Sequence, residues 1–445
     1  MEVEIISREK VKPSSPTPHH LKIYKFSLLD QIIPPTFFPA VLYFLPESDS
    51  YASQKVHILK ESLSLNLTRF YPFAGIINDD LSVCCNDEGI PFFEAKVRGN
   101  LQDFLSRPDL LAITKFLPIE FSFDTAKPGD HVSAIQMNCF ECGGMAISIV
   151  VAHNVADGMT VSAFFRGWAA AARSTGEEIY PKFIGRDLFP SVDAMEKESK
   201  LFCHDFFKFL RLGKYVTRRY LFDASVIAKL KARSASSDAS TMAYPTSIEV
   251  ISAFIWKCYM KVFADKSDLD KPFILTHPVN LRRRADPALP DDSFGNFLWL
   301  TAAQCISPAD TSLKDLASEV RRAIRNIDHR FVKVLQNNGY YENLEETRKG
   351  LPEGANCLAF SSWCKFGLYG VDFGWGKPIW ISSFVSGNSE SMLANSVTLM
   401  DTRFGDGIEA WVILDEKHVV AFEENEDLQN YVLINHSPLQ FGKKI

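Results

Sequence analysis

The sequence predicts an α/β protein with two halves of similar size, for three reasons. Strand-like and helix-like patterns alternate along the chain, which is typical of mixed α/β folds. The length of 445 residues corresponds to two or three domains of ~100–200 residues each. The pattern loosens between Pro181 and Tyr215, where prolines, Gly213 and mixed charges predict a long connection between the halves.

In the first half, apolar segments predict three strands, at residues 37–45, 132–140 and 145–152. The last of these is apolar on both faces, which indicates a central strand. Helical spacing predicts a helix over residues 56–70, which ends at Tyr71-Pro72 because the residue before a proline avoids helical angles. A second helix follows with an apolar face from Val161 to Ala172, and Gly176 is a suitable stop for it.

Strand-like and helix-like patterns also alternate in the second half. Helical spacing predicts helices over residues 224–233, 247–262 and 314–327, of which the second is buried and the third lies on the surface. It predicts strands over residues 219–222, 358–363, 378–384, 397–401 and 408–414.

Composition and charge exclude several classes of function. Hydrophobic residues make up 46% and charged residues 23%, as in ordinary soluble globular proteins. The net charge of -6, without a long run of like charge, argues against a nucleic-acid partner. No apolar stretch reaches the ~18 residues of a membrane span, and the N-terminus does not resemble a signal peptide. We therefore expect a cytoplasmic protein.

Cysteine usage indicates reduced thiols and no metal site. Nine cysteines are thinly spread over the chain, which does not suit a disulfide framework. Cys139 and Cys142 form a single C-x-x-C, and no second pair completes a tetrahedral zinc site.

The strongest candidate for a functional site is the stretch from His153 to Asp157 and Gly158. The apolar run before it ends at His153, which places an imidazole at the end of a buried strand, where a cleft can open. An imidazole can take and return a proton near neutral pH. Gly158 permits unusual backbone angles, so Asp157 can turn inward to a structural partner and hold the loop.

His153 has two other interpretations. An isolated histidine is often a core residue satisfied by backbone groups, and that alternative stays open. A metal site is disfavoured, because a histidine and an aspartate four residues apart share a face only on a helix, and this pair lies in a predicted loop.

The segment Asp372-Phe373-Gly374-Trp375-Gly376, followed by a lysine and a proline, predicts a rigid turn that carries a bulky side chain. Asp-Phe-Gly also occurs in protein kinases, but no glycine-rich loop or His-Arg-Asp loop precedes it here. The chain also lacks a Gly-x-Ser-x-Gly elbow, a P-loop and a dinucleotide-binding Gly-x-Gly-x-x-Gly.

Three consecutive arginines, from Arg282 to Arg284, follow an apolar segment, so at least one of them is expected to point inward. A buried guanidinium needs a carboxylate partner, and Asp157 and Asp372 are the candidates.

Together these motifs resemble those of the plant BAHD acyltransferases, which use acyl-coenzyme A. The signatures H-x-x-x-D-G, from His153 to Gly158, and D-F-G-W-G, from Asp372 to Gly376, are both intact and in the expected order. Other segments that resemble the family extend over nearly the whole chain: Leu28-Leu29-Asp30-Gln31, Tyr71-Pro72-Phe73-Ala74-Gly75, Cys84-Cys85-Asn86-Asp87-Glu88-Gly89, residues 401–411 and Phe422-Glu423.

Within the family, Ser361-Ser362-Trp363-Cys364 and Gly407-Ile408-Glu409-Ala410-Trp411 are typical of the branch that contains vinorine synthase and deacetylvindoline acetyltransferase. Two positions differ from the common pattern. Ile76 stands where many relatives have a basic residue, and Ser361 stands where threonine is common.

The resemblance implies two domains similar to chloramphenicol acetyltransferase, with mixed sheets and flanking helices and with a solvent channel between them. We expect an N-terminal domain over residues 1–185, a crossover loop over 186–216 and a C-terminal domain over 217–445. Coenzyme A would enter the channel from one face and the acceptor from the other, with His153 at its centre.

The resemblance also implies roles for individual residues. His153 would act as the general base of a direct acyl transfer, and Ser361 and Trp363 are candidates to stabilise the oxyanion. Asp157 and Asp372 would be required for activity through architecture, Asp157 by pairing with Arg282 and Asp372 by bracing its loop. The structural glycines and the tryptophan of the two signatures are Gly158, Gly374, Gly376 and Trp375.

We expect acetyl-coenzyme A as co-substrate, no permanently bound cofactor, and a monomer without a nucleic-acid or membrane partner. Candidate contacts to the co-substrate are Ser247, Ser252 and Arg284, although Arg284 fits a bracing role equally well. The expected acceptor is a hydroxyl of an alkaloid of the monoterpene indole type. Acylation of a sugar, terpenoid or other alcohol with a different acyl donor stays open, as does a binding protein without turnover.

Five aromatic residues either line the cleft or belong to the core, and the sequence does not distinguish the two: Phe37, Phe38, Phe294, Phe297 and Trp299.

Overall fold

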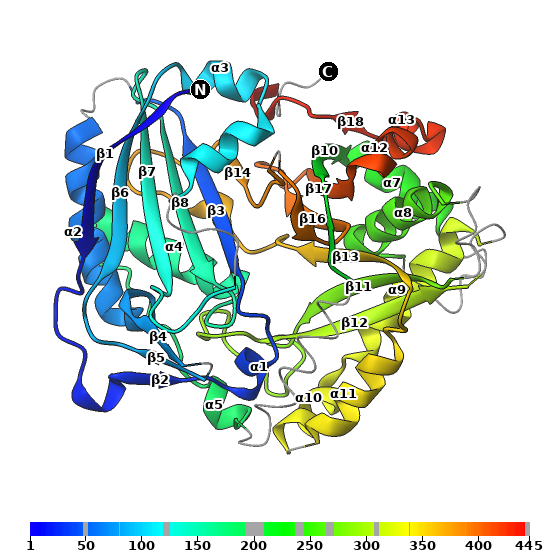
Figure 1. The fold of residues 1–445 in the computed structure, drawn as a ribbon, viewed down its shortest axis with the longest axis horizontal. Helices are drawn as coiled ribbons and strands as arrows, with labels where there is room; N and C mark the ends of the chain where they lie inside the picture. The colour runs from blue at the N-terminus through cyan, green and yellow to red at the C-terminus, as the bar shows by residue number, and fades with distance from the viewer. Residues whose placement is uncertain are drawn as a thin grey trace.

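A computed structural model describes residues 1–47, 52–79, 81–118, 125–191, 209–235, 244–263, 271–306, 311–337, 339–387 and 389–440. Two large β-sheets with helices packed on them lie beside one another, which confirms the predicted α/β architecture (Figure 1). None of the described helices is long and apolar enough to cross a membrane.

The sheet of the N-terminal half is six-stranded and mixed. Its strands, in spatial order, are β1 (Val3–Val11), β6 (Ile90–Val97), β7 (Ser133–Phe140), β8 (Met145–Ala152), β3 (Phe37–Phe44) and β14 (Trp380–Ser382). The predicted central position of β8 is confirmed, because every residue of β8 is buried and the strand pairs with β7 on one side and β3 on the other.

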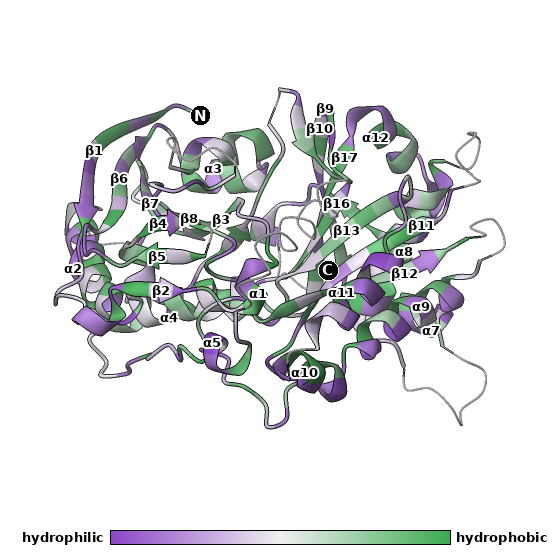
Figure 2. Ribbon diagram, turned by 60° about the horizontal axis from the view of Figure 1, so that its bottom comes forward, coloured by the Kyte–Doolittle hydropathy of each residue, from purple (hydrophilic) through white to green (hydrophobic). Residues whose placement is uncertain are grey.

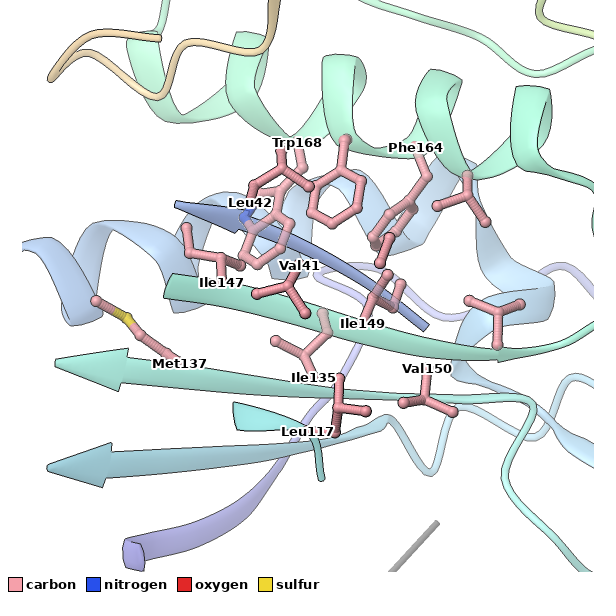
Figure 3. Packing of buried hydrophobic residues seen from close by; sticks show 14 of the residues in the cluster. Val41, Leu42, Leu117, Ile135, Met137, Ile147, Ile149, Val150, Phe164 and Trp168 are labelled. Atoms are coloured by element: carbon pink, nitrogen blue, oxygen red, sulfur yellow. The ribbon is translucent and has the colours of Figure 1, made fainter. Parts of the chain in front are cut away.

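Two long helices, α2 (Ala52–Arg69) and α4 (Gly158–Arg173), pack against this sheet. Phe164 and Trp168 of α4 point onto Val41, Ile147 and other apolar residues of the strands (Figure 3). The Trp168 indole N–H donates to the main-chain oxygen of Leu59 in α2 at 3.0 Å, so a buried polar atom is satisfied between the helices. The helix α4 ends at Ser174, which adopts a left-handed conformation with φ 52°, two residues before the expected stop at Gly176.

The sheet of the C-terminal half has seven strands. They are, in spatial order, β12 (Leu298–Cys305), β11 (Phe273–Asn280), β13 (Asn356–Ser362), β16 (Ser396–Asp401), β17 (Gly407–Asp415), β10 (Tyr215–Asp223) and β18 (Leu433–Ile434). Helices α8 (Ser247–Lys261) and α9 (Leu313–Asn326) cover its apolar core. As predicted, α8 is largely buried, and α9 shows both hydrophilic and hydrophobic colours in Figure 2.

The remaining elements are short. The other α-helices are α1 (Leu28–Gln31), α3 (Leu101–Ser106), α5 (Gly185–Leu188), α7 (Ala224–Arg233), α10 (His329–Gln336), α11 (Tyr340–Lys349), α12 (Glu416–Glu423) and α13 (Glu426–Tyr431). The short 3-10 helices are His19–Leu21, Tyr71–Ala74, Leu110–Phe116, Leu368–Gly370 and Pro438–Gln440. Two small sheets are formed by β2 (Ile23–Lys25), β5 (Ser82–Cys84) and β4 (Ile76–Asp79), and by β9 (Arg211–Gly213) with β15 (Ser391–Leu393).

The strand β14 lies in the sheet of the opposite half. It pairs antiparallel with β3, and the Ser382 hydroxyl lies 3.0 Å from the Tyr43 hydroxyl. Phe373, a few residues earlier, is buried in the N-terminal core. Part of the predicted C-terminal domain therefore completes the N-terminal sheet. The boundaries at 185 and 217 stay a prediction, and residues 192–208 of the expected crossover lie outside the described residues.

The two sheets meet at a buried aromatic and ionic cluster. Trp380 of β14 stacks on Trp411 of β17 with ring centroids 5.4 Å apart, and Arg219 of β10 lies over the Trp380 ring at 4.8 Å. The Trp380 indole N–H donates to the Glu409 carboxylate at 3.3 Å. This cluster fixes the halves against each other beside the end of β13.

Candidate active site

His153 directly follows β8 and lies where the two halves meet. Its main-chain N–H donates to the Thr36 oxygen at 2.7 Å, at the start of β3. Its main-chain oxygen accepts from the side-chain amide of Asn296, which comes from the C-terminal half, at 2.8 Å. The imidazole is partly exposed and packs on the Phe38 ring with centroids 4.7 Å apart. The predicted strand-to-loop delivery of this ring is confirmed.

The surroundings of the His153 ring favour a neutral imidazole. Burial lowers its pKa below the ordinary 6.5, and its own carbonyl, the Asp157 charge and the Asn296 side chain partly oppose that shift. The ring atom Nδ1 is buried and has no hydrogen-bond partner within 3.5 Å among the described residues. A neutral histidine keeps one nitrogen free to accept a proton near neutral pH.

Asp157 starts α4 as its N-cap. Its carboxylate accepts from the Thr160 N–H at 2.9 Å and from the Phe297 N–H at 3.1 Å. Both terminal nitrogens of Arg282 donate to it, at 2.6 and 3.0 Å. Burial raises the Asp157 pKa, but Arg282 and these donors outweigh burial and hold the pKa below its usual value. The Asp157 carboxylate is therefore ionised, and both of its oxygens already accept hydrogen bonds.

Arg282 is fully buried and connects the two halves. Besides Asp157 it donates to the Ser293 oxygen at 2.9 Å, and its guanidinium lies 4.6 Å from the Phe297 ring centroid. Of the two partners that the arginine run left open, the structure selects Asp157 for Arg282. Both charges are removed from water, so the loss of either partner would leave the other charge buried and unpaired. The intact pair therefore fixes the position of the loop.

Asp30 and Asn296 complete the surroundings of His153 and were not predicted as site residues. The Asp30 carboxylate accepts from Ser27 and from both nitrogens of Asn296. Burial raises the Asp30 pKa to about 6, against these donors. Ser27 and Asp30 form a capping box, which has the sequence pattern Ser-x-x-Asp. That pattern was the local signal by which Asp30 could have been singled out.

The Asp372 loop lies at the other end of α4. The Asp372 carboxylate accepts from the main-chain N–H groups of Gly374 at 2.8 Å and Gly376 at 3.0 Å. Both glycines have positive φ, 107° and 94°, which favours glycine there. Arg173, the last residue of α4, donates to the Asp372 main-chain oxygen. The geometry is that of a braced turn, as predicted.

Trp375 projects from this turn onto α2. The Lys55 ammonium lies 5.3 Å from the Trp375 ring centroid and is only 3% exposed. Burial lowers the Lys55 pKa, with Glu47 opposing. On the other side, Trp375 stacks on Phe373, which packs on Trp168. The contact between Lys55 and Trp375 was not predicted from the sequence, because the residues around Lys55 do not indicate that its side chain has a buried partner.

We expect an Asp372→Ala variant to lower the free energy of unfolding by about 1 kcal/mol, because two exposed main-chain N–H groups lose a charged acceptor that water only partly replaces. Urea titration measures this. Asp372→Asn is the matched control, because it keeps the acceptor oxygen and should retain most of the stability. Equal losses in the two variants would contradict the bracing role.

Trp363 contacts Phe38, the ring that also packs on His153. The rings of Phe38 and Trp363 are nearly perpendicular, with centroids 6.1 Å apart. Trp363 also lines a cavity of about 260 Å³ together with Tyr369 of a 3-10 helix, Ile381 of β14, Met400 of β16 and Arg403 of the β16–β17 turn. Ser361, partly buried, pairs with Thr398 through the β13–β16 ladder.

The start of α4 makes a close contact with the segment after Trp363. A side chain at Gly158 would place its Cβ 2.3 Å from the Phe366 ring, so only glycine permits this approach. The Ser162 hydroxyl donates to the Phe366 main-chain oxygen. Gly158 therefore lets the C-terminal half pack beside His153.

The three candidate contacts to the co-substrate belong to the C-terminal half, and their role stays a prediction. Ser252 is fully buried on α8, and its hydroxyl has no partner within 3.5 Å among the described residues. Ser247 is the first residue of α8. Arg284 donates to the main-chain oxygens of Asn280 at 3.1 Å and Ile324 at 3.5 Å, which is the bracing alternative. Within the described part of the chain, no group of three histidine, cysteine or acidic side chains is arranged to hold a metal ion.

Of the five aromatic residues that either line the cleft or belong to the core, Phe38 touches His153. The other four are buried in the apolar cores: Phe37, Phe294, Phe297 and Trp299. Phe297 also carries Arg282 on its face.

Comparison with known proteins matches residues 1–429 to the model of the Transferase family. An epi-neemfruitin B 7-O-acetyltransferase from Melia azedarach is 40% identical, and a limonoid 7-O-acetyltransferase from Citrus sinensis is 38% identical. Each covers 99% of this chain and matches over 100% of its own length. Stemmadenine O-acetyltransferase from Catharanthus roseus is 34% identical and covers 93% of this chain and 94% of its own.

Solved structures share the whole architecture. The crystal structure of vinorine synthase is 31% identical and superposes with a TM-score of 0.78, covering 97% of this chain and 98% of its own. The TRI101 protein of F. sporotrichioides, solved with coenzyme A and T-2, has a TM-score of 0.68 at 17% identity, over 93% of this chain and 99% of its own. At that identity the second match shows the fold alone.

Proposed function

This chain belongs to the Transferase family of plant BAHD acyltransferases, and we propose that it transfers an acetyl group from acetyl-coenzyme A to a hydroxyl of a polycyclic acceptor. It is an acyltransferase, as its relatives are. One observation supports the proposed chemistry most: a neutral His153 at the junction of the halves, in contact with the Phe38 ring.

In the proposed reaction His153 removes the proton of the acceptor hydroxyl. The oxygen then attacks the thioester carbonyl and forms a tetrahedral oxyanion, for which Ser361 and Trp363 are the candidate donors. The carbon–sulfur bond breaks, and the histidine returns the proton to the departing thiolate. Atoms and charge balance without an acyl-enzyme, and no resident cofactor takes part.

Asp157 and Asp372 have a different function in this scheme. Each hydrogen bond that the Asp157 carboxylate accepts in the structure comes from Arg282 or from a main-chain N–H group. Asp372 holds its own turn. We therefore assign both to architecture, and proton transfer to His153 alone.

The names of the relatives support a choice of acceptors to test first. The two relatives at 40% and 38% identity are named for 7-O-acetylation, one of them of a limonoid, and stemmadenine O-acetyltransferase stands at 34%. We propose a limonoid-type terpenoid alcohol as the first acceptor to test, and an alkaloid alcohol, the class expected from the sequence, as the second. We also propose that the chain acts as a monomer.

The test is to incubate the protein with acetyl-coenzyme A and a panel of limonoid, alkaloid and sugar alcohols while following free thiol. Thiol release that needs both the donor and one alcohol supports the proposal. No release with any donor and alcohol, from a folded protein, would favour the alternative of a binding protein without turnover.

The pH dependence provides a second test. Because burial lowers the His153 pKa, its basic form persists to a lower pH than in a free histidine. kcat/KM should therefore fall with a midpoint below pH 6.5 as the pH is lowered from about 8 to about 5. Asp30, with a pKa of about 6, titrates in the same window, so Asp30→Asn is measured in parallel. A midpoint at or above 6.5 in both proteins would contradict a base that the surroundings keep neutral.

A further inference from the structure

The position of the proposed base limits where the acyl group of the co-substrate can lie. A general base lies about 2.6–3.2 Å from the oxygen whose proton it takes, and reacting atoms approach one another to about 3–3.5 Å. The thioester carbon therefore lies within about 7 Å of the His153 imidazole when the acceptor hydroxyl attacks it. A side chain in contact with this ring is close enough to limit the size of the acyl group.

Phe38 is in contact with the His153 ring. The two ring centroids are 4.7 Å apart, and the ring planes are tilted by 48°. Phe38 pairs with Val151 in the ladder between β3 and β8, two residues before His153. Successive side chains of a strand point to opposite faces, so the neighbouring Phe37, which is buried in the core, points away from Phe38. The strand β3 thus determines which phenylalanine reaches the imidazole.

Two further aromatic rings continue from Phe38. Trp363 is nearly perpendicular to Phe38 with centroids 6.1 Å apart, and Phe366 stacks on Trp363 at 6.3 Å. Phe366 in turn lies against Gly158, where an added Cβ would be 2.3 Å from its ring. Phe38, Trp363 and Phe366 therefore form one aromatic wall that extends from His153 to the start of α4.

The aromatic wall is firmly held and partly open to solvent. His153 and the three rings of the wall are each only partly buried, so they keep surface that a substrate can contact. The Trp363 main-chain N–H donates to the Leu399 oxygen at 2.8 Å, and the Ser162 hydroxyl donates to the Phe366 main-chain oxygen. Because the main chain is fixed at these points, the wall cannot move back to admit a larger group.

We propose that Phe38 is a specificity-determining residue of the acyl transfer: its ring excludes acyl groups larger than acetyl from the space beside His153. The proposal rests on the proposed acyl transfer. The step is the same for every donor, since the acyl–sulfur bond breaks, the bond to the acceptor oxygen forms, and His153 passes the proton to the thiolate. Donors differ only in the space that they need, and a misfit of one methylene group in an apolar pocket changes kcat/KM by about 10- to 200-fold.

The experiment compares acetyl-, butanoyl- and benzoyl-coenzyme A by thiol release, with the alcohol that the panel identifies. Wild-type protein should prefer acetyl- to benzoyl-coenzyme A by about 100-fold or more in kcat/KM. Phe38→Ala removes one phenyl ring, and benzoyl carries a phenyl ring where acetyl has a methyl group. This variant should therefore reduce the preference by about 10-fold or more. Phe38→Leu vacates less space and should admit butanoyl but not benzoyl.

The ratio of kcat/KM for two donors, measured on one protein preparation, separates specificity from a merely structural role. Loss of the Phe38 ring also removes a packing contact of His153. A displaced base slows the reaction with every donor alike, so it cancels in the ratio. Only a change in the space for the acyl group changes the ratio.

Phe37 offers a matched control. It is the neighbouring phenylalanine of β3, and it is 8% exposed and belongs to the apolar core of the N-terminal half. Phe37→Leu should lower the stability of the protein and leave the donor ratio at its wild-type value.

The outcomes separate this inference from the proposed function. Wild-type protein that releases no thiol with any of the three donors refutes the acyl transfer, and the role of Phe38 with it. Active wild type that uses benzoyl- as readily as acetyl-coenzyme A overturns only the role of Phe38, even if Phe38→Ala does not fold. Folded Phe38→Ala or Phe38→Leu with the wild-type donor ratios overturns that role as well.

Discussion

Replacing His153 with alanine is expected to lower kcat by about 100- to 10,000-fold, the usual cost of removing a general base. The fold should be almost unaffected, with a loss of about 1 kcal/mol or less, because the ring is partly exposed and its Nδ1 makes no hydrogen bond within 3.5 Å to a described residue. Thiol release and thermal melting of the same preparation measure the two effects.

His277 is a matched control for that variant. It is buried on β11, its Nδ1 lies 3.0 Å from the Pro278 oxygen, and its Nε2 has no partner within 3.5 Å among the described residues. His277→Ala should destabilise the protein and leave kcat unchanged. If His153→Ala keeps full product formation, or melts as readily as a variant of Asp157, the assignment of the base is wrong.

Replacing Asp157 with alanine should lower the free energy of unfolding by about 3–5 kcal/mol, because it leaves the fully buried Arg282 charge without its partner. Activity should fall as well, since the loop that carries His153 loses its connection to the other half. Urea titration and thiol release are the measurements.

A double-mutant cycle tests the origin of that loss. Arg282→Met removes the charge but keeps an apolar side chain against Phe297. The double variant Asp157→Ala/Arg282→Met should be more stable than the sum of the two single losses predicts, since neither charge is then left buried alone. Additive losses would show that the pair is not what holds the loop.

The site could be predicted from the sequence only where one segment carries the whole signal. The apolar run of β8 ends at His153 and the next helix starts at Asp157, so strand, histidine and N-cap follow one another within a few residues. The pairing of Asp157 with Arg282 bridges 125 residues: the arginine run left both Asp157 and Asp372 open as partners, and only the family resemblance favoured Asp157. Asn296 and Asp30 are 266 residues apart, and no local pattern of either one points to the other.

The fold shows the same limit. The edge strand β1 was not predicted, because its residues alternate between exposed and half-buried and its charged side chains hide the apolar ones. The strand β14 was predicted, but its place in the N-terminal sheet depends on Trp380, which stacks on Tyr43 at 5.1 Å. That contact is a property of the assembled halves.

Direct transfer through His153 makes one measurement decisive: the intact mass of the protein quenched during turnover with acetyl-coenzyme A and its alcohol. We predict unmodified protein at every time point, with acetyl groups only on the donor and the product. An acetyl adduct on a serine or cysteine that forms and decays at the rate of turnover would contradict the mechanism.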